Sequence, residues 1–308
     1  MKVSRRPLFR TDGGGRCRQW RLLPWLLLWL GMSAAWAQQA SPSAEALLAR
    51  HAAMQSRLES SPLGRPLVVD SEELPGGLRG EVFAVIDQPF AQAAKALAAP
   101  GNWCDMLLLH INNRNCRLIK GEGGAPPAVE LSVVRRYDLP VESAFILRMA
   151  LRVDDSAPDY LMVDLRSDDG PMGTSQHQVR VEAVPLAGGV QTFLHFSYSY
   201  QHNGLARVAT QAYLATFGRN KVGFTVVGDG PEYIRGLRGL VERNSVRYFL
   251  TVDAFLGAMR SPPAQQTERR LSAWYAGSEQ FPRQLHEIDR PTYMAIKSAD
   301  RSRNAASP

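Results

Sequence analysis

Residues 232–259 read EYIRGLRGLVERNSVRYFLTVDAFLGAM, and this stretch decides the fold. Apolar side chains recur in it every three or four residues, which places them along one face of an α-helix of about eight turns. Pro231 precedes the stretch and Pro262-Pro263 follow it, so we expect one long helix whose apolar face packs on another layer. The residues of this apolar stripe are Ile234, Leu237, Val241, Ser245, Tyr248, Val252, Phe255 and Met259.

The segments that precede this helix predict an antiparallel sheet. In residues 142–154 the odd-numbered positions from Phe145 to Val153 are apolar, whereas Arg148 and Arg152 lie between them. This period of two is typical of an antiparallel strand with one buried face. Turn sequences such as Asp168-Asp169-Gly170-Pro171 separate the strands. The other strands are expected at residues 82–86, 116–120, 129–136, 160–166, 176–186 and 190–200.

The order of the elements points to a known superfamily. Gly80-Glu81-Val82-Phe83-Ala84-Val85-Ile86-Asp87-Gln88-Pro89-Phe90 predicts a strand that runs into an Ala-rich helix, and Trp103 lies in a second short helix. Strand, two short helices, antiparallel strands and a long helix resemble the START-like helix-grip superfamily of lipid-transfer proteins, plant allergens and polyketide cyclases. The resemblance covers roughly residues 78–260. Residues 204–230, which separate the last strand from the long helix, and the helices after residue 263 depart from its pattern.

The resemblance implies an α+β fold. A curved antiparallel sheet of about six to seven strands would grip the long C-terminal helix, with extra helices at the C-terminus and an apolar cavity between sheet and helix. It implies no catalytic residues, because the superfamily has no shared catalytic motif.

The first 37 residues predict a signal peptide. A basic segment comes first, the apolar run Leu22–Leu30 follows, and Ala35-Trp36-Ala37 has the small residues of a cleavage site. The run is short for a membrane span, and a retained anchor is the alternative. We therefore expect a periplasmic protein, cleaved after Ala37, with no transmembrane anchor after processing.

The predicted signal also explains the high positive charge. It contains seven of the 36 Lys and Arg and one of the 29 Asp and Glu, which leaves 29 against 28. A nearly neutral mature chain gives no indication of nucleic-acid binding.

The rest of the chain divides into four expected segments. Residues 38–77 would form an N-terminal helix and a linker, and residues 78–260 the helix-grip-like domain. Residues 261–299 would be a C-terminal helical extension, and residues 300–308 a disordered tail.

Cys104 and Cys116 are the cysteines left after removal of the signal. In an oxidising compartment two cysteines twelve positions apart favour a structural disulfide, with two buried thiols or a metal site as alternatives. The sequence has no P-loop, no dinucleotide-binding fingerprint, no zinc spacing and no nucleophile elbow, so we expect no cofactor and no metal.

Four polar side chains are candidates to contact a ligand in the cavity. Each has an alternative structural role. Arg148 would form a cross-strand salt bridge with Glu182 or Asp164, and His195 would be hydrogen-bonded on the solvent face. Arg238 would form an i,i+4 pair with Glu242 on the long helix, and Tyr198 would belong to the aromatic core. The sequence does not say which face of each strand points inward. The candidates are Arg148, His195, Tyr198 and Arg238.

These features favour a periplasmic carrier or sensor that binds a hydrophobic small molecule or lipid between sheet and helix. One alternative is a non-catalytic partner in a cell-envelope assembly, which would use the tail aromatics Trp274, Tyr275, Phe281 and Tyr293 if they are exposed. Another is a cyclase or isomerase, which would need His195 and Glu242 as an acid–base pair.

Overall fold

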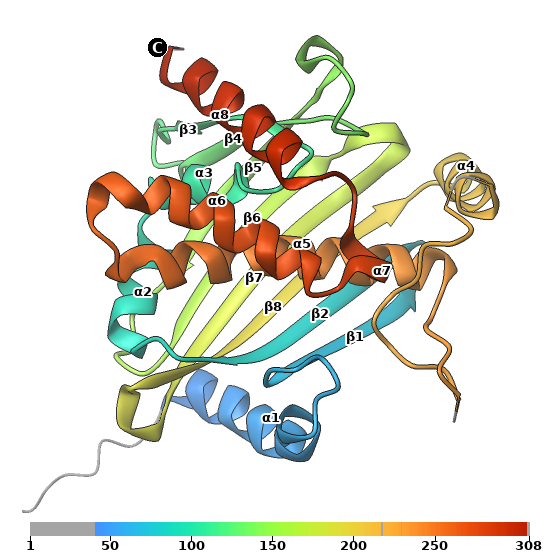
Figure 1. Cartoon of the computed structure of the whole chain (residues 1–308). Coiled ribbons are helices and arrows are strands. Elements are labelled where there is room, and N and C mark those ends of the chain that lie inside the picture. The colour runs from blue at the N-terminus through green and yellow to red at the C-terminus, as the bar shows by residue number, and fades with distance from the viewer. Residues whose placement is uncertain (1–40, 217, 229, 307–308) are drawn as a thin grey trace, which may run out of the picture. The chain divides into compact units, whose positions relative to one another are not determined.

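The computed structural model describes residues 41–216, 218–228 and 230–306, and the predicted signal peptide lies outside them. These residues belong to one compact unit, in which eight strands form a single antiparallel sheet covered by helices (Figure 1). The strands are β1 (Leu67–Leu74), β2 (Gly77–Ile86), β3 (Asn113–Ile119), β4 (Ala128–Val133), β5 (Phe145–Asp154), β6 (Leu161–Asp169), β7 (Thr174–Leu186) and β8 (Gln191–His202). The α-helices are α1 (Pro42–Glu59), α2 (Phe90–Ala98), α3 (Asn102–Leu107), α4 (Gly204–Ala215), α5 (Gly236–Gly257), α6 (Pro263–Glu279), α7 (Pro282–Leu285) and α8 (Arg290–Ala306).

The sheet has the strand order β1-β2-β8-β7-β6-β5-β4-β3. The alternation expected in β5 is confirmed, because Leu147, Met149 and Leu151 are buried while Arg148 and Arg152 are exposed. The same alternation gives every central strand an apolar inner face. The α+β class and the curved antiparallel sheet predicted from the sequence are therefore confirmed, with one strand more than the range expected.

The additional strand is β1, which lies where the sequence predicts a linker. Its apolar part, Leu67-Val68-Val69, is only three residues long, and polar residues fill most of the remainder. Such a short run is not recognised as a strand by its periodicity. It forms because it is an edge strand that pairs along its whole length with β2.

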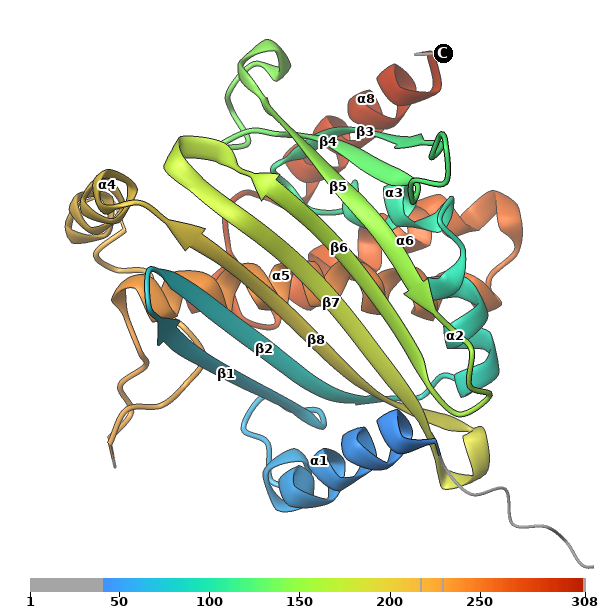
Figure 2. The same ribbon diagram turned by 180° about the vertical axis from the view of Figure 1, so that it is seen from behind.

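The long helix α5 lies along the inner face of the sheet, beside β1, β2 and β8 (Figures 1 and 2). It begins at Gly236, four residues later than expected. Gly236 has a φ of +66°, which is outside the helical region, and Tyr233 before it forms a β-bridge with Val226. Glycine tolerates this conformation, and the chain therefore turns into the helix here.

The outer face of the sheet is covered in part by α1. Ala44, Leu47 and Leu58 of this helix are buried against Phe83 and Phe193 of the sheet. Much of the remaining outer face is polar, as expected for an antiparallel sheet with one face toward water.

The C-terminal helices complete the core rather than extend from it. The indole of Trp274 in α6 stacks on the ring of Tyr293 in α8 with centroids 5.0 Å apart, and Tyr293 donates a hydrogen bond to the carbonyl of Leu109. Trp274, Phe281 and Tyr293 are buried and Tyr275 is partly buried. The aromatic side chains that would have marked an exposed partner surface therefore belong to the core.

The expectation of a disordered tail is wrong for residues 300–306, which continue α8. Ion pairs hold this segment: Asp300 is fully buried and accepts hydrogen bonds from Arg114 of β3 and from Lys297. The end of α8 has no apolar stripe, so its polar composition resembles that of a tail.

The disulfide predicted between Cys104 and Cys116 is confirmed and joins α3 to β3, with Cα atoms 5.3 Å apart. Replacing both cysteines with serine is expected to lower the free energy of unfolding by roughly 2–3 kcal/mol, because the unfolded chain regains the entropy of the closed loop. Urea denaturation of the oxidised protein and of the double variant measures this difference. A reducing agent should destabilise the wild type and leave the variant unchanged; equal midpoints for both proteins would contradict the prediction.

Candidate functional site

Arg148 lies on the outer face of the sheet and is exposed. Its guanidinium donates a hydrogen bond to Glu130, 2.8 Å away on the neighbouring strand, and the two residues are register partners. Arg148 therefore forms a cross-strand salt bridge, although with Glu130 rather than with Glu182 or Asp164. It does not face the space between sheet and α5.

His195 also lies on the outer face, where it stacks on Phe83 beneath α1. Its Nδ1 is 2.9 Å from Glu182 and its Nε2 is 2.9 Å from Glu81. Two flanking carboxylates require that both ring nitrogens donate, which only the imidazolium can do. Burial opposes this charge, but the hydrogen bonds to Glu182 and Glu81 outweigh it and raise the pKa of His195.

Arg238 of α5 lies near the edge strand β1. Its Nε donates to the hydroxyl of Ser71, 3.1 Å away, and that hydroxyl donates to Glu242 over 2.6 Å. Glu242 is fully buried and accepts two further hydrogen bonds from the backbone N–H groups of Phe224 and Thr225. This carboxylate thus fixes the segment before α5 to the helix.

The acid–base pair of His195 and Glu242 does not form. His195 lies on the outer face with α1, whereas Glu242 belongs to α5 on the inner face. Strand alternation could not assign these faces from the sequence. The geometry gives no support to an enzyme built on this pair.

Tyr198 lies on the inner face of β8 and belongs to a group of aromatic and polar side chains. Its hydroxyl is 3.3 Å from Nδ1 of His177, and its ring centroid is 5.7 Å from that of Tyr248 on α5. Tyr248 in turn stacks on His110, with centroids 4.6 Å apart. We call Tyr198, His177, Tyr248, His110 and Asn113 the interior polar cluster.

His110 carries a buried hydrogen-bond donor that has no partner among the described residues. Its Nδ1 accepts a hydrogen bond from the backbone N–H of Asn112, so the proton of the neutral ring is on Nε2. Burial lowers the pKa of His110 well below its usual value, which keeps the ring neutral. Nε2–H therefore points into the protein with its hydrogen bond unmade.

Asn113 carries the complementary acceptor. Its Nδ2 donates to the carbonyl of Leu107 over 2.8 Å, whereas Oδ1 is buried and without a partner. The hydroxyl of Ser245, on the sheet-facing side of α5, is also buried and has no hydrogen-bond partner among the described residues. Buried polar atoms are nearly always paired in folded proteins, so these unpaired groups are exceptional features of the interior.

The interior polar cluster is uncharged at neutral pH. Burial lowers the pKa of His177 to about 4, and burial raises the pKa of Tyr248 to about 12. Together with neutral His110, the members of the cluster offer hydrogen bonds but no formal charge. The two cations that act on His110, Lys297 and Arg247, are paired with Asp300 and Glu287. A neutral polar group therefore suits the cluster better than an anion.

Two clefts open at the edges of the core. One, of about 240 Å³, is lined by Arg65 and Asp253 among others, near the C-terminal end of α5. The other, of about 270 Å³, lies at the ends of β6, β7 and β8 and is lined in part by His177 and Tyr200. His177 thus connects the interior polar cluster to the surface.

The space midway between the sheet and α5 holds packed side chains. Val246 and Phe249 of the helix and Leu165, Leu194 and Phe196 of the sheet are at most 1% exposed. The apolar cavity implied by the family resemblance is therefore filled by side chains in this conformation.

The sequence held a signal for Tyr248 of this cluster and for the buried hydroxyl of Ser245. Ser245 and Tyr248 belong to the apolar stripe of the long helix, and their polar atoms interrupt it. His110, Asn113 and His177 gave no such signal, because His110 comes from a short connection and the other two from the irregular starts of β3 and β7. In the described part of the chain, no three His, Cys, Asp or Glu side chains are placed to hold a metal ion.

No protein family and no curated protein matches this chain. The solved structures similar to it include norcoclaurine synthase from Thalictrum flavum, with 14% identity over 50% of this chain and 87% of that one and a TM-score of 0.32. The lipid transfer and protein localization domain of human StarD13 has 6% identity over 45% and 71%, with a TM-score of 0.35. A START superfamily protein from Mycobacterium smegmatis has 12% identity over 44% and 77%, with a TM-score of 0.29.

These likenesses concern the fold alone. The predicted START-like helix-grip arrangement is present in the chain itself, as an antiparallel sheet with a long helix along its inner face. What the neighbours bind or catalyse does not extend to this chain, whose interior polar cluster has to be interpreted from its own residues.

Proposed function

We propose that this protein is a carrier or sensor for a neutral amphipathic molecule, such as a lipid or a hydrophobic small molecule that bears a hydroxyl group. The observation that carries the proposal is the unpaired donor and acceptor beside Tyr248, His110 Nε2–H and Asn113 Oδ1. A hydroxyl group can accept from the first and donate to the second. The enclosing core is apolar and suits the rest of such a molecule.

The energetics support a bound ligand. Each buried polar group without a partner costs about 1–3 kcal/mol, and a ligand that pairs with both groups removes this cost. The apolar part of the ligand would add roughly 25 cal/mol for each Å² removed from water. The cleft at His177 and Tyr200 offers an entrance, and rotation of buried aromatic side chains would make room.

We also propose that the protein acts in the periplasm. The support is the sequence alone: a basic segment, a short apolar run and Ala35-Trp36-Ala37. None of the helices in the described ranges is both long and apolar enough to cross a membrane. A contact surface for an envelope protein is the weaker proposal, because Trp274 and Tyr293 are buried.

The test is native mass spectrometry of the protein, expressed from the full chain in a Gram-negative host and purified after processing, before and after exposure to total envelope lipid. We expect one apolar adduct per chain, identified by extraction. In the variant His110→Phe, which loses the Nε2 donor but keeps an aromatic ring, occupancy should fall about tenfold.

His286→Phe is the matched control, because His286 is an exposed histidine paired with Glu279. It should bind as the wild type does. A clean apo mass in all conditions would overturn the proposal, and so would an adduct that His110→Phe retains in full.

A further inference from the structure

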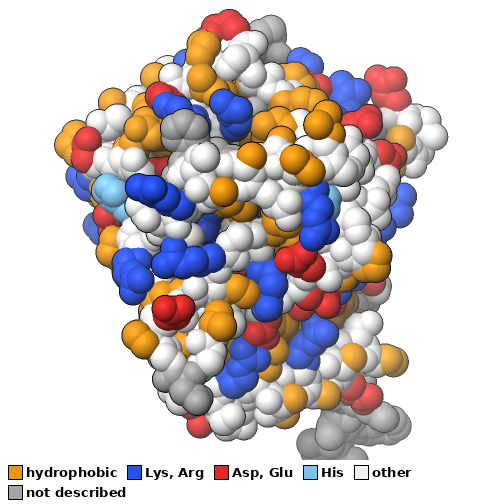
Figure 3. All heavy atoms as spheres, turned by 90° about the vertical axis from the view of Figure 1, so that its right-hand side faces the viewer, with side chains coloured by type: hydrophobic (Ala, Val, Ile, Leu, Met, Phe, Trp, Pro, Cys, Tyr) orange, Lys and Arg blue, Asp and Glu red, His pale blue; other side chains and the backbone are white. Residues whose placement is uncertain are grey.

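The hairpin that joins β6 to β7 has a strained backbone. It contains η2 (Pro171–Gly173) and two non-glycine residues with a positive φ, Met172 at +55° and Gln176 at +49°. Side chains are costly in this left-handed region, and surrounding contacts must hold them there. The hairpin lies at the upper right of Figure 1 beside α4, and Figure 3 looks onto this side, where hydrophobic and charged side chains are mixed.

The strain at Gln176 comes from a β-bulge. The pairing of β7 with β8 shifts by one residue between Ser175 and Gln178, so the bulge includes Gln176. A bulge residue in the left-handed conformation is usually glycine, which adopts it without a steric penalty. Glutamine at this position therefore stores strain that a glycine would not.

The strained hairpin closes over His177, which is only 4% exposed. Nε2 of this ring is 2.8 Å from the hydroxyl of Thr174. That hydroxyl donates to the carbonyl of Pro171 over 2.6 Å, so it accepts the Nε2 proton. A Cβ atom at Gly170 would lie 2.1 Å from the same nitrogen, so the backbone of the hairpin rests directly on the ring.

The other side of the His177 ring contacts the interior polar cluster. Nδ1 is 3.3 Å from the hydroxyl of Tyr198, and the ring stacks on that of Tyr200 with centroids 5.4 Å apart. The cleft of about 270 Å³ is lined by Gln176, His177 and Tyr200 among others. Lifting the hairpin would therefore uncover the ring that lies between this cleft and the cluster.

A positive φ alone does not distinguish this hairpin. Ala187, at +47°, lies in the turn that joins β7 to β8 at the other end of these strands. In that turn, a Cβ atom added to Gly188 or Gly189 would meet no heavy atom within 4 Å among the described residues. The β6–β7 hairpin differs because its strained backbone covers a buried, hydrogen-bonded ring.

We propose that residues 170–176 form a lid that opens and closes over His177 and so controls access to the interior polar cluster. In the closed form, the hydrogen bond between Thr174 and His177 offsets the strain at Met172 and Gln176. When this bond breaks, the strained residues relax and the hairpin lifts from the ring. The use of the lid as an entrance rests on the proposed function, but its opening needs no ligand, so the two can fail separately.

The test is hydrogen exchange, measured by mass spectrometry on the processed protein without added ligand. Gln176→Gly removes strain from the closed form, so the amides of residues 168–178 should exchange about threefold more slowly than in the wild type. Thr174→Val keeps the shape of the side chain but loses its hydroxyl, and it should speed exchange there about fivefold. The amides of β5 should exchange as in the wild type in both variants.

Reaction of His177 with diethyl pyrocarbonate near neutral pH measures access to the ring directly. It should slow about threefold in Gln176→Gly, which leaves the partners of His177 in place. Ala187→Gly is the matched control, because it removes the same kind of strain from the other hairpin and should change neither rate.

The inference is overturned if Gln176→Gly leaves both rates as in the wild type, or if Ala187→Gly slows them as much. It is also overturned if Thr174→Val speeds exchange equally throughout the sheet, because the protein would then unfold as a whole rather than open a lid.

Discussion

Replacing Asp300 with alanine is expected to lower the free energy of unfolding by about 3–5 kcal/mol. Asp300 is fully buried in α8 and accepts hydrogen bonds from Arg114 Nε, Lys297 Nζ and Arg303 Nη1, each at 3.0 Å. Its removal leaves the buried charges of Lys297 and Arg114 without their counter-charge. Lys297 cannot turn to solvent, because its ammonium also donates to the carbonyls of His110 and Asn113.

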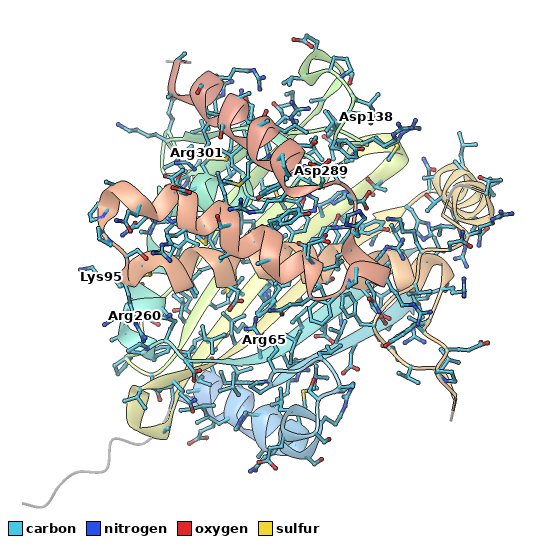
Figure 4. The ribbon with its side chains drawn as sticks, in the orientation of Figure 1. Arg65, Lys95, Asp138, Arg260, Asp289 and Arg301 are labelled. Carbon is cyan, nitrogen blue, oxygen red and sulfur yellow. A yellow bond between two sulfur atoms is a disulfide. The ribbon has the colours of Figure 1, made fainter. Side chains whose placement is uncertain are left out.

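Urea denaturation followed by circular dichroism measures this loss. Asp138→Ala is the control, since Asp138 forms an exposed ion pair with Arg136 on a surface loop (Figure 4). Its midpoint should stay close to that of the wild type. Equal midpoints for Asp300→Ala and the wild type would show that α8 does not depend on this network.

The second large effect is a loss of stability in acid that comes from His177. Burial lowers the pKa of this residue from 6.5 to about 4. As the pH falls below 6.5 the unfolded chain takes up the proton and the folded protein does not, so stability falls until about pH 4 and then levels off. The shift corresponds to about 3 kcal/mol lost across this window.

The measurement is the free energy of unfolding as a function of pH for the wild type and for His177→Gln. The glutamine can keep a hydrogen bond to Thr174 but does not titrate, so the variant should lose much less stability between pH 6.5 and pH 4. Parallel curves for the two proteins would show that His177 titrates normally.

His195 provides the opposite case. The pKa of His195 is raised in the folded protein, so its contribution to the free energy of unfolding is complete below pH 6.5. That contribution is lost as the pH rises through the pKa of the folded state. His195→Gln should therefore differ from the wild type in slope above pH 6.5 rather than below it.

Much of the fold follows from periodicity. The apolar stripe of α5 and the alternation in β5 fix a long helix and an antiparallel sheet, and the order of the elements suggested how they meet. β1 was missed because edge pairing rather than an apolar pattern holds it. The end of α8 was missed because Asp300 and Lys297 are buried through charge pairing, which a hydrophobicity pattern does not record.

Less of the candidate site could be predicted. Of the four candidate ligand contacts, Tyr198 alone joins the interior polar cluster, while Arg148 and His195 lie on the outer face and Arg238 contacts the edge strand. A one-residue choice of strand face decides the outcome for Arg148, His195 and Tyr198, and the sequence cannot make that choice. Arg238 lies on α5, where its contact with Ser71 depends on the edge strand β1 that the sequence did not predict. His110 and Asn113 were missed because tertiary contacts, not local spacing, bury them.

The dependence of the core on α8 has a consequence for how the chain is made. Tyr293 and Lys297 close over the segment that carries His110, yet they lie almost 190 residues later in the sequence. A nascent chain that has been synthesised only as far as α5 cannot bury that segment. The core around His110 is therefore completed only after α8, the last helix described, has been synthesised.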